Sequence, residues 1–110
     1  MATASTTSPA PSRDLSALTD ELCDALLTPK NRAEMRLLLL DLCTPAEIRT
    51  LAERWHVARL LDGTELSYRD IHDATGVSTT TIVRVGRFLK QEPNQGYRKA
   101  IDRMGGAGAR

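Results

Sequence analysis

Aromatic residues are scarce in this chain of 110 residues, which has only Trp55, Tyr68, Phe88 and Tyr97. A surface that binds single-stranded nucleic acid by stacking needs several aromatic side chains close together. Four residues scattered along the sequence do not supply one, so this class of binding is excluded. The length excludes large catalytic scaffolds as well, such as a (β/α)8 barrel of roughly 250 residues.

Cysteine and long apolar runs are also rare. Cys23 and Cys43 have neither C-x-x-C spacing nor a histidine at metal-ligand spacing, which excludes a disulfide framework. We expect both to be small buried apolar groups in a reducing cytoplasm. The longest apolar run, residues 37–40, is far shorter than the ~20 residues that span a bilayer. The N-terminus lacks the apolar segment of a secretory signal. These absences predict a cytoplasmic protein with no membrane partner.

Motifs for catalysis are missing too. The chain has no glycine-rich phosphate loop and no nucleophile in a known motif. Its two histidines, His56 and His72, have no metal-ligating residues at clear spacing. We therefore expect no catalytic residue, no metal site and no enzyme activity.

Charge is distributed unevenly along a chain whose net charge is only +1. Residues 1–66 carry 7 basic and 10 acidic side chains, whereas residues 67–110 carry 8 basic and 4 acidic ones. Such an asymmetry favours an anionic partner for the second half. The alternative is that the basic half is a solvated face with no partner.

The two ends lack hydrophobic periodicity. Residues 1–13 are mainly Ala, Ser, Thr and Pro, and the chain ends in GGAGAR. We expect a disordered N-terminal tail at 1–13 and a flexible C-terminal tail at 105–110. Residues 14–104 should form a single all-α domain, because the alternating pattern of a β-strand is absent throughout.

Apolar residues recur at the three- and four-residue spacing of helices. The predicted helices cover residues 14–27, 31–42, 45–62, 68–75 and 78–90. Pro93, Asn94 and Gly96 indicate a break followed by a last helix at 97–104, and a single helix over 91–104 is the alternative. The helix at 31–42 is apolar nearly all round and must be buried on more than one side. Because a domain of this size offers little interior, we expect this helix to lie in the core of a homodimer.

The helix that starts at residue 45 has clear signals at both ends. Thr44-Pro45-Ala46-Glu47 is a capping box with proline at the first helical position. Gly63 predicts the end of this helix. Trp55 lies on its apolar stripe, so we expect this side chain in the core rather than in a ligand site.

Residues 67–90 have the pattern of a helix-turn-helix. Ser67 and Ser78 are suited to cap the two helices, and Gly76 interrupts them with a residue that tolerates positive φ. Two helices joined by a three-residue turn containing glycine are typical of this motif. The positions predicted to face inward and hold the helices together are Ile71, Ala74, Val77, Ile82 and Val85.

The opposite side of the second helix carries Thr79, Thr80, Val83, Arg84 and Arg87. These residues suit a DNA major groove, because hydroxyls bond base edges, a valine methyl contacts a thymine methyl, and arginine reaches guanine or phosphate. The alternative is an ordinary helical hairpin with a solvated face, since any surface helix has polar residues opposite its apolar stripe.

About half of the chain carries further motifs in a fixed order. They are Leu40-Asp41-Leu42-Cys43-Thr44-Pro45-Ala46-Glu47, Arg54, Leu60-Leu61, Ser67-x-Arg69, Gly76 through Thr81-Ile82 to Arg84, and Leu89-Lys90. On these motifs, residues 37–90 resemble the Trp repressor superfamily, including its YerC/YecD-like branch. The resemblance implies an intertwined helical homodimer with a helix-turn-helix at about 68–90. It also implies a bacterial transcriptional repressor that binds a palindromic operator in double-stranded DNA, on the nucleoid within the cytoplasm.

The resemblance also adds residues to the predicted DNA-binding set. The position of Arg69 is that of a family arginine that contacts a base edge, and the position of His72 faces DNA. Family contacts at this face are made in part through water. The full predicted set is Arg69, His72, Thr79, Thr80, Val83, Arg84, Arg87 and, as an outlying phosphate contact, Lys90.

The resemblance is weaker at the effector pocket. Family repressors hold the indole ring of L-tryptophan between two arginines, which correspond to Arg54 and Arg84, and a threonine at the position of Thr44 lines that pocket. In this chain Val85 replaces a glycine that leaves room for the ligand, and Phe88 replaces a serine that helps to bind it. We therefore expect that no cofactor is required. The alternatives are an L-tryptophan-dependent repressor and a helical dimerisation or adaptor protein that does not bind DNA.

Overall fold

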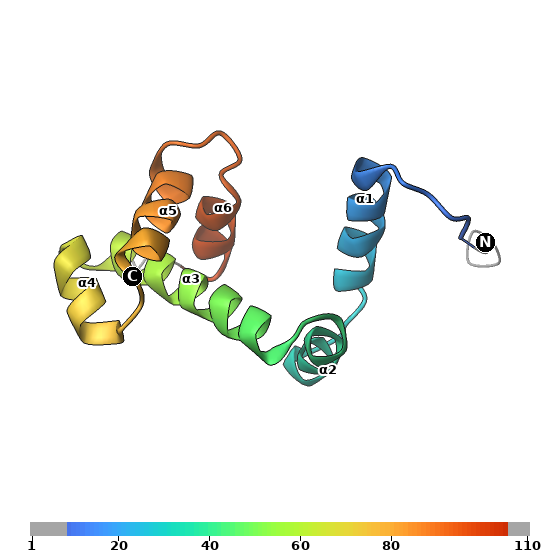
Figure 1. The fold of residues 1–110 in the computed structure, drawn as a ribbon, viewed down its shortest axis with the longest axis horizontal. Coiled ribbons are helices and arrows are strands. Elements are labelled where there is room, and N and C mark those ends of the chain that lie inside the picture. Colours follow the sequence, from blue (N-terminus) through green and yellow to red (C-terminus); the bar gives the residue numbers. More distant parts are fainter. Residues whose placement is uncertain (1–8, 106–110) are drawn as a thin grey trace. The chain divides into compact units, whose positions relative to one another are not determined.

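A computed structural model describes residues 9–105, which form six α-helices and no strand (Figure 1). The helices are α1 (Leu15–Leu26), α2 (Arg32–Leu42), α3 (Pro45–Gly63), α4 (Tyr68–Thr75), α5 (Thr79–Lys90) and α6 (Gly96–Arg103). The all-α prediction is confirmed. The predicted tails fall mostly on residues 1–8 and 106–110, which lie outside the described range. None of the helices in that range has both the length and the apolar character needed to cross a bilayer.

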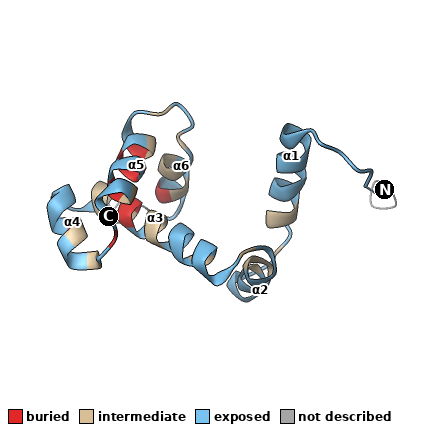
Figure 2. Cartoon of the chain, viewed as in Figure 1, coloured by how far each residue is buried: buried red, intermediate tan, exposed pale blue. Residues whose placement is uncertain are grey.

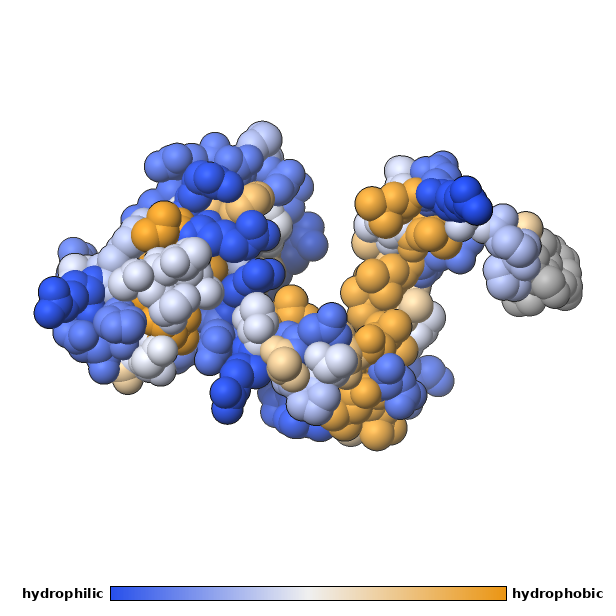
Figure 3. Space-filling model, viewed as in Figure 1, coloured by the Kyte–Doolittle hydropathy of each residue, from blue (hydrophilic) through white to orange (hydrophobic). Residues whose placement is uncertain are grey.

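The chain divides into two units, and Met1–Leu42 is the first. Its helices α1 and α2 contain no buried residue (Figure 2). Both helices instead expose leucine side chains, which are orange in Figure 3: Leu15, Leu18 and Leu22 on α1, and Leu37, Leu40 and Leu42 on α2. A single chain therefore does not provide the burial that the apolar pattern of 31–42 predicts.

The prediction that both cysteines are buried is wrong for the single chain. Cys23 is exposed, because it lies on α1, where no side chain is buried. Cys43 is half-buried in the link between α2 and α3.

Helix α5 is central to the second unit, Cys43–Arg110, and packs against α3, α4 and α6. The buried core contains Val57, Ala58, Ile71, Val77, Ile82, Val85, Leu89 and Ile101. Four of the five predicted inward positions of the helix-turn-helix belong to it, but Ala74 is exposed. Thr75 occupies the inner side of α4 instead, four residues after Ile71, and its hydroxyl donates a hydrogen bond of 2.7 Å to the Ile71 carbonyl. Residues three and four positions after Ile71 both lie on its side of the helix, so the spacing alone allows either Ala74 or Thr75 at the inner position.

The capping signals fix most helix ends where the sequence predicts them. The hydroxyl of Thr44 accepts from the Glu47 N–H at 3.1 Å, and the Glu47 carboxylate accepts from the Thr44 N–H at 2.8 Å. Gly63 is the last residue of α3, so the predicted end of this helix is confirmed. Thr64 follows as the C-cap residue, and its N–H and hydroxyl both donate to the carbonyl of Leu60.

Helix α6 is tied to α3 by a stacked aromatic pair and an ion pair. The rings of Trp55 and Tyr97 lie 6.3 Å apart at 28°, and Trp55 packs against the core as predicted. Arg98 donates to the carboxylate of Asp62 at 2.6 Å, and this hydrogen bond raises the pKa of Arg98. The predicted break before this helix is present and includes Pro93. These contacts fix α6 against α3.

Candidate nucleic-acid interface

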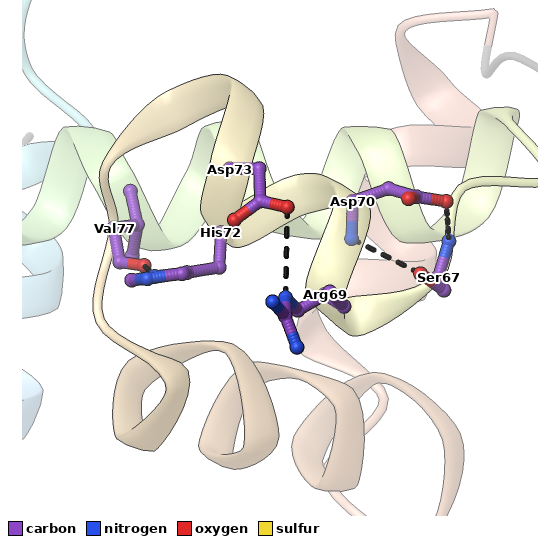
Figure 4. A network of polar contacts seen from close by, with 6 residues as sticks. All are labelled: Ser67, Arg69, Asp70, His72, Asp73 and Val77. Atoms are coloured by element: carbon purple, nitrogen blue, oxygen red, sulfur yellow. Dashed lines mark hydrogen bonds and ion pairs between the residues drawn. The ribbon is translucent and has the colours of Figure 1, made fainter.

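The turn between α4 and α5 is built by local hydrogen bonds. Gly76 adopts the left-handed conformation, with φ 77°, as predicted. The hydroxyl of Ser78 accepts from the Thr81 N–H at 3.2 Å and so caps α5. Nδ1 of His72 lies 2.8 Å from the carbonyl oxygen of Val77 (Figure 4). Because a carbonyl only accepts, Nδ1 carries the proton of this bond. The turn therefore holds the two helices in a fixed relation.

At Gly86, α5 packs tightly against the side chain of Tyr68 on α4. Gly86 is buried, and a β-carbon placed on it would lie 3.0 Å from Cζ of Tyr68, with the phenol oxygen closer still. Only a hydrogen atom fits between the helix and the ring. This contact was not predicted from the sequence, although a glycine inside a predicted helix is a signal of close packing.

One side of α5 is exposed and the other is buried. The buried side contains Ile82, Val85, Gly86 and Leu89. The exposed face of α5 consists of the six predicted DNA-binding residues of this helix, namely Thr79, Thr80, Val83, Arg84, Arg87 and Lys90. The helix contains no acidic residue, so this face presents hydroxyl groups at its start and positive charge towards its end.

The two predicted residues on α4 are placed differently from each other. Arg69 is exposed, and its Nε lies 3.6 Å from Oδ2 of Asp73 one turn later (Figure 4). His72 is half-buried, and its Nδ1 is used by the bond to Val77. Only Nε2 of this ring remains for an external contact. The Arg69–Asp73 pair was not predicted from the sequence, although its four-residue spacing on a helix was the available signal.

The arginines of α5 have partners within the chain. The guanidinium carbon of Arg84 lies 4.5 Å from the ring centroid of Phe88, and that of Arg87 lies 5.4 Å from it. Nε of Arg87 is also 3.5 Å from a carboxylate oxygen of Glu92. Phe88 and Glu92 therefore orient the basic end of the exposed face, in cation–π and ion-pair contacts that the sequence analysis missed.

A helix-turn-helix with a basic outer face is a feature of many regulators, and comparison with known proteins is decisive. The model of the Trp repressor protein family matches residues 17–105. The chain belongs to the Trp repressor family. The predicted resemblance is therefore confirmed.

Individual relatives support the same family. The chain is 42% identical over 86 residues to YerC, an uncharacterized protein of Bacillus subtilis (strain 168), and the match covers 77% of this chain and 80% of YerC. A crystal structure from Staphylococcus aureus, assigned to the Trp repressors, superposes with a TM-score of 0.74 at 39% identity and covers 84% of this chain and 95% of the other. A TrpR-like protein from Eubacterium eligens ATCC 27750 gives 0.74 at 37% identity, covering 81% and 90%.

The residues predicted for the family's effector pocket lie at the start of α3, on α3 and on α5. Thr44 is the N-cap of α3, and Arg54 lies ten residues later, about 15 Å along the helix axis. Thr44 is also committed to its capping box. Val85 is buried in the core, and the half-buried ring of Phe88 lies against the guanidinium of Arg84.

Two further features lie near this region of the Trp repressor fold. Nε of the half-buried Arg54 has no hydrogen-bond partner among the described residues. A pocket of about 290 Å³ is lined by Trp55, Phe88, Asn94, Gly96 and Tyr97, and so includes one of the predicted effector-pocket residues. Residues 9–105 contain no cluster of three or more His, Cys, Asp or Glu side chains that could hold a metal.

Proposed function

We propose that this protein is a transcriptional repressor that binds a specific sequence of double-stranded DNA as a homodimer. The exposed face of α5 is the observation that carries the proposal. It combines hydroxyls near the start of the helix with three basic residues and no acidic one. Membership in the Trp repressor family supports regulation through DNA binding.

The physical fit to DNA follows from the chemistry of this face. A B-DNA major groove is about 12 Å wide and admits one α-helix. Thr79 and Thr80 lie at the start of α5, where side chains of recognition helices meet base edges. Basic residues nearer the end of the helix suit phosphates, whose neutralisation releases counterions. The protein would act in the bacterial cytoplasm, on the nucleoid.

The homodimer is supported by the exposed leucines of α1 and α2. A second copy of the chain would cover these apolar side chains, and two helix-turn-helix units related by two-fold symmetry would match a palindromic site. The double substitution Leu37→Glu with Leu40→Glu should convert the dimer to a monomer in sedimentation velocity. Arg36→Ala, on the same helix, should leave the dimer intact.

We also propose that DNA binding needs no L-tryptophan. Phe88 already places an aromatic ring 4.5 Å from the guanidinium carbon of Arg84. The neighbouring Val85 fills the core with a side chain where family repressors have glycine. Both observations favour a protein in which Arg84 is held by side chains of its own chain rather than by a bound L-tryptophan.

A binding selection on genomic DNA fragments, run with the full chain with and without L-tryptophan, tests these proposals together. A palindromic site enriched in both arms is the expected result. Arg87→Ala should then weaken binding to all sequences by a similar factor, and Arg103→Ala on α6 should change it little. Enrichment only with L-tryptophan would reject the effector-free proposal. No enrichment in either arm would reject DNA binding and favour an adaptor protein.

A further inference from the structure

The exposed side of α4 carries an ion pair whose position is hard to explain by stability. Nε of Arg69 and Oδ2 of Asp73 are 3.6 Å apart, and the two side chains are 85% and 62% exposed. Pairs this open to water contribute little to the folded state. The pair nevertheless involves the α4 arginine that the proposed function places against a DNA base.

The other acid of α4, Asp70 in its first turn, has a clear structural role, which Asp73 lacks. Asp70 accepts a hydrogen bond from the Ser67 N–H at 3.1 Å and completes the capping box of α4 (Figure 4). Asp73 lies one turn from Arg69, and Arg69 is its ion-pair partner within the described residues. An unneutralised carboxylate beside DNA would be repelled by phosphates. Its presence next to a base-contacting arginine therefore calls for a function in recognition.

We propose that Asp73 is a positioning residue that determines the base specificity of Arg69, and this inference rests on the proposed DNA binding. By pairing with Nε, the carboxylate leaves the two terminal nitrogens of the guanidinium, Nη1 and Nη2, free. These two donors match the O6 and N7 acceptors of guanine in the major groove. The exposed arginine would otherwise sample many rotamers.

Charge gives the pair a second effect on specificity. Arg69 and Asp73 together are neutral, so they add nothing to the general attraction for phosphates that drives non-specific binding. The arginine contributes only where both of its terminal donors meet acceptors. At another base those donors lose their partners, and the carboxylate remains close to the groove without compensation.

The test compares Asp73→Ala with a closely matched control. Asp102 on α6 has the same four-residue spacing to an arginine, with Oδ1 3.4 Å from Nη1 of Arg98, and the same 62% exposure. Asp102→Ala removes the same charge from a helix outside the helix-turn-helix. Arg69→Ala first identifies the base position that this arginine contacts in the site selected by the wild-type protein.

Asp73→Ala should lower the preference for guanine at that position by about tenfold. It should also steepen the slope of log affinity against log salt on non-specific DNA by about 0.9 per chain. Asp73→Asn keeps the size of the side chain but removes the charge of the 3.6 Å ion pair, so it should share both the lower guanine preference and the steeper slope. Asp102→Ala should change neither quantity.

The outcomes separate this inference from the proposed function. If the wild-type protein selects no sequence, the proposed function fails and the inference fails with it. If it selects a site and Asp73→Ala keeps the same guanine preference, DNA binding stands and the inference is overturned. An equal loss at all sequences would indicate a structural role for Asp73 and overturn it as well. The same holds if Asp102→Ala reproduces the effect.

Discussion

Replacing Gly86 by alanine probes the packing that fixes the angle between α4 and α5. The added β-carbon would lie 3.0 Å from Cζ and 3.6 Å from Cε2 of Tyr68, with the phenol oxygen inside van der Waals contact. Something must move, and the backbone of α5 is held by its buried neighbours Val85 and Leu89. Tyr68 must therefore shift or the two helices must separate.

Two opposing terms set the size of the effect. Alanine favours a helix interior over glycine by about 0.8–1 kcal/mol. Overpacking of a filled site typically costs about 1–3 kcal/mol. The difference predicts that Gly86→Ala lowers the free energy of unfolding by about 1 kcal/mol. For a domain of this size the Tm should fall by roughly 4 °C or more.

The decisive assay measures the same substitution with the tyrosine removed. In a Tyr68→Ala background the clash is absent and only the helix preference remains, so Gly86→Ala should now stabilise the protein by up to about 1 kcal/mol. Urea unfolding of the four proteins at one fixed concentration gives the coupling energy. Gly96→Ala serves as a control, because a β-carbon there meets nothing within 4 Å. A stabilising effect of Gly86→Ala in the wild-type background, or an equal effect in both backgrounds, would refute this account of the packing.

Three further predictions concern single interactions. Hydrogen bonds from Ser67 lower the pKa of Asp70 below 3.8. The ionised carboxylate therefore stabilises α4 above pH 3.8, and this contribution is lost as the pH falls through the lower pKa of the folded state. Asp70→Asn should reduce the decrease of the unfolding free energy at acid pH, which is the acid limb of its pH profile. Arg98→Met should cost about 1–3 kcal/mol in urea unfolding, because Asp62 is only 14% exposed and loses a partner at 2.6 Å. Gly76→Ala should lower stability by about 1–2 kcal/mol in calorimetry, because the φ of Gly76 is 77°.

Each of these predictions has a matched comparison. Asp73→Asn removes a carboxylate from the same helix outside the capping box, and an identical acid limb in both variants would contradict the role of Asp70. Asp102→Ala removes only the more exposed of the two acidic partners of Arg98. A loss of unfolding free energy as large as that of Arg98→Met would therefore argue against the importance of the pair with Asp62. Gly76→Asn should be tolerated better than alanine, since asparagine adopts the left-handed conformation more readily.

The helices could be predicted because their signals are local. The capping box at 44–47 and Gly76 fix ends and turns through contacts between residues three or four positions apart. The errors arise where two local signals compete. Ala74 and Thr75 both fit an inward position, and the hydroxyl of Thr75 decides in favour of the latter. The end of α3 at Gly63 was predicted correctly, but the bond from the Thr64 hydroxyl to the Leu60 carbonyl was not.

The candidate site was less predictable because its geometry depends on side-chain rotamers. Periodicity places the residues of the exposed face of α5 on one side of the helix. It does not show that Phe88 lies against Arg84, or that Asp73 holds Nε of Arg69. The packing of Tyr68 over Gly86 depends on how closely two helices approach each other. Residue spacing within a single helix does not predict that distance.

These side-chain partners change how strongly the interface should respond to salt. Of the four cationic side chains in the predicted DNA-binding set, Arg69 is paired with Asp73 and Arg87 with Glu92. Arg84 and Lys90 have no ion pair within the described residues, and the contact of Arg84 with an aromatic ring leaves its charge intact. Two net charges per chain predict a log–log salt slope near −3.6 for a dimer on non-specific DNA, whereas four free charges would give about −7. Fluorescence anisotropy of a labelled duplex over a range of salt concentrations measures this slope, and a value near −7 would show that DNA displaces both carboxylates.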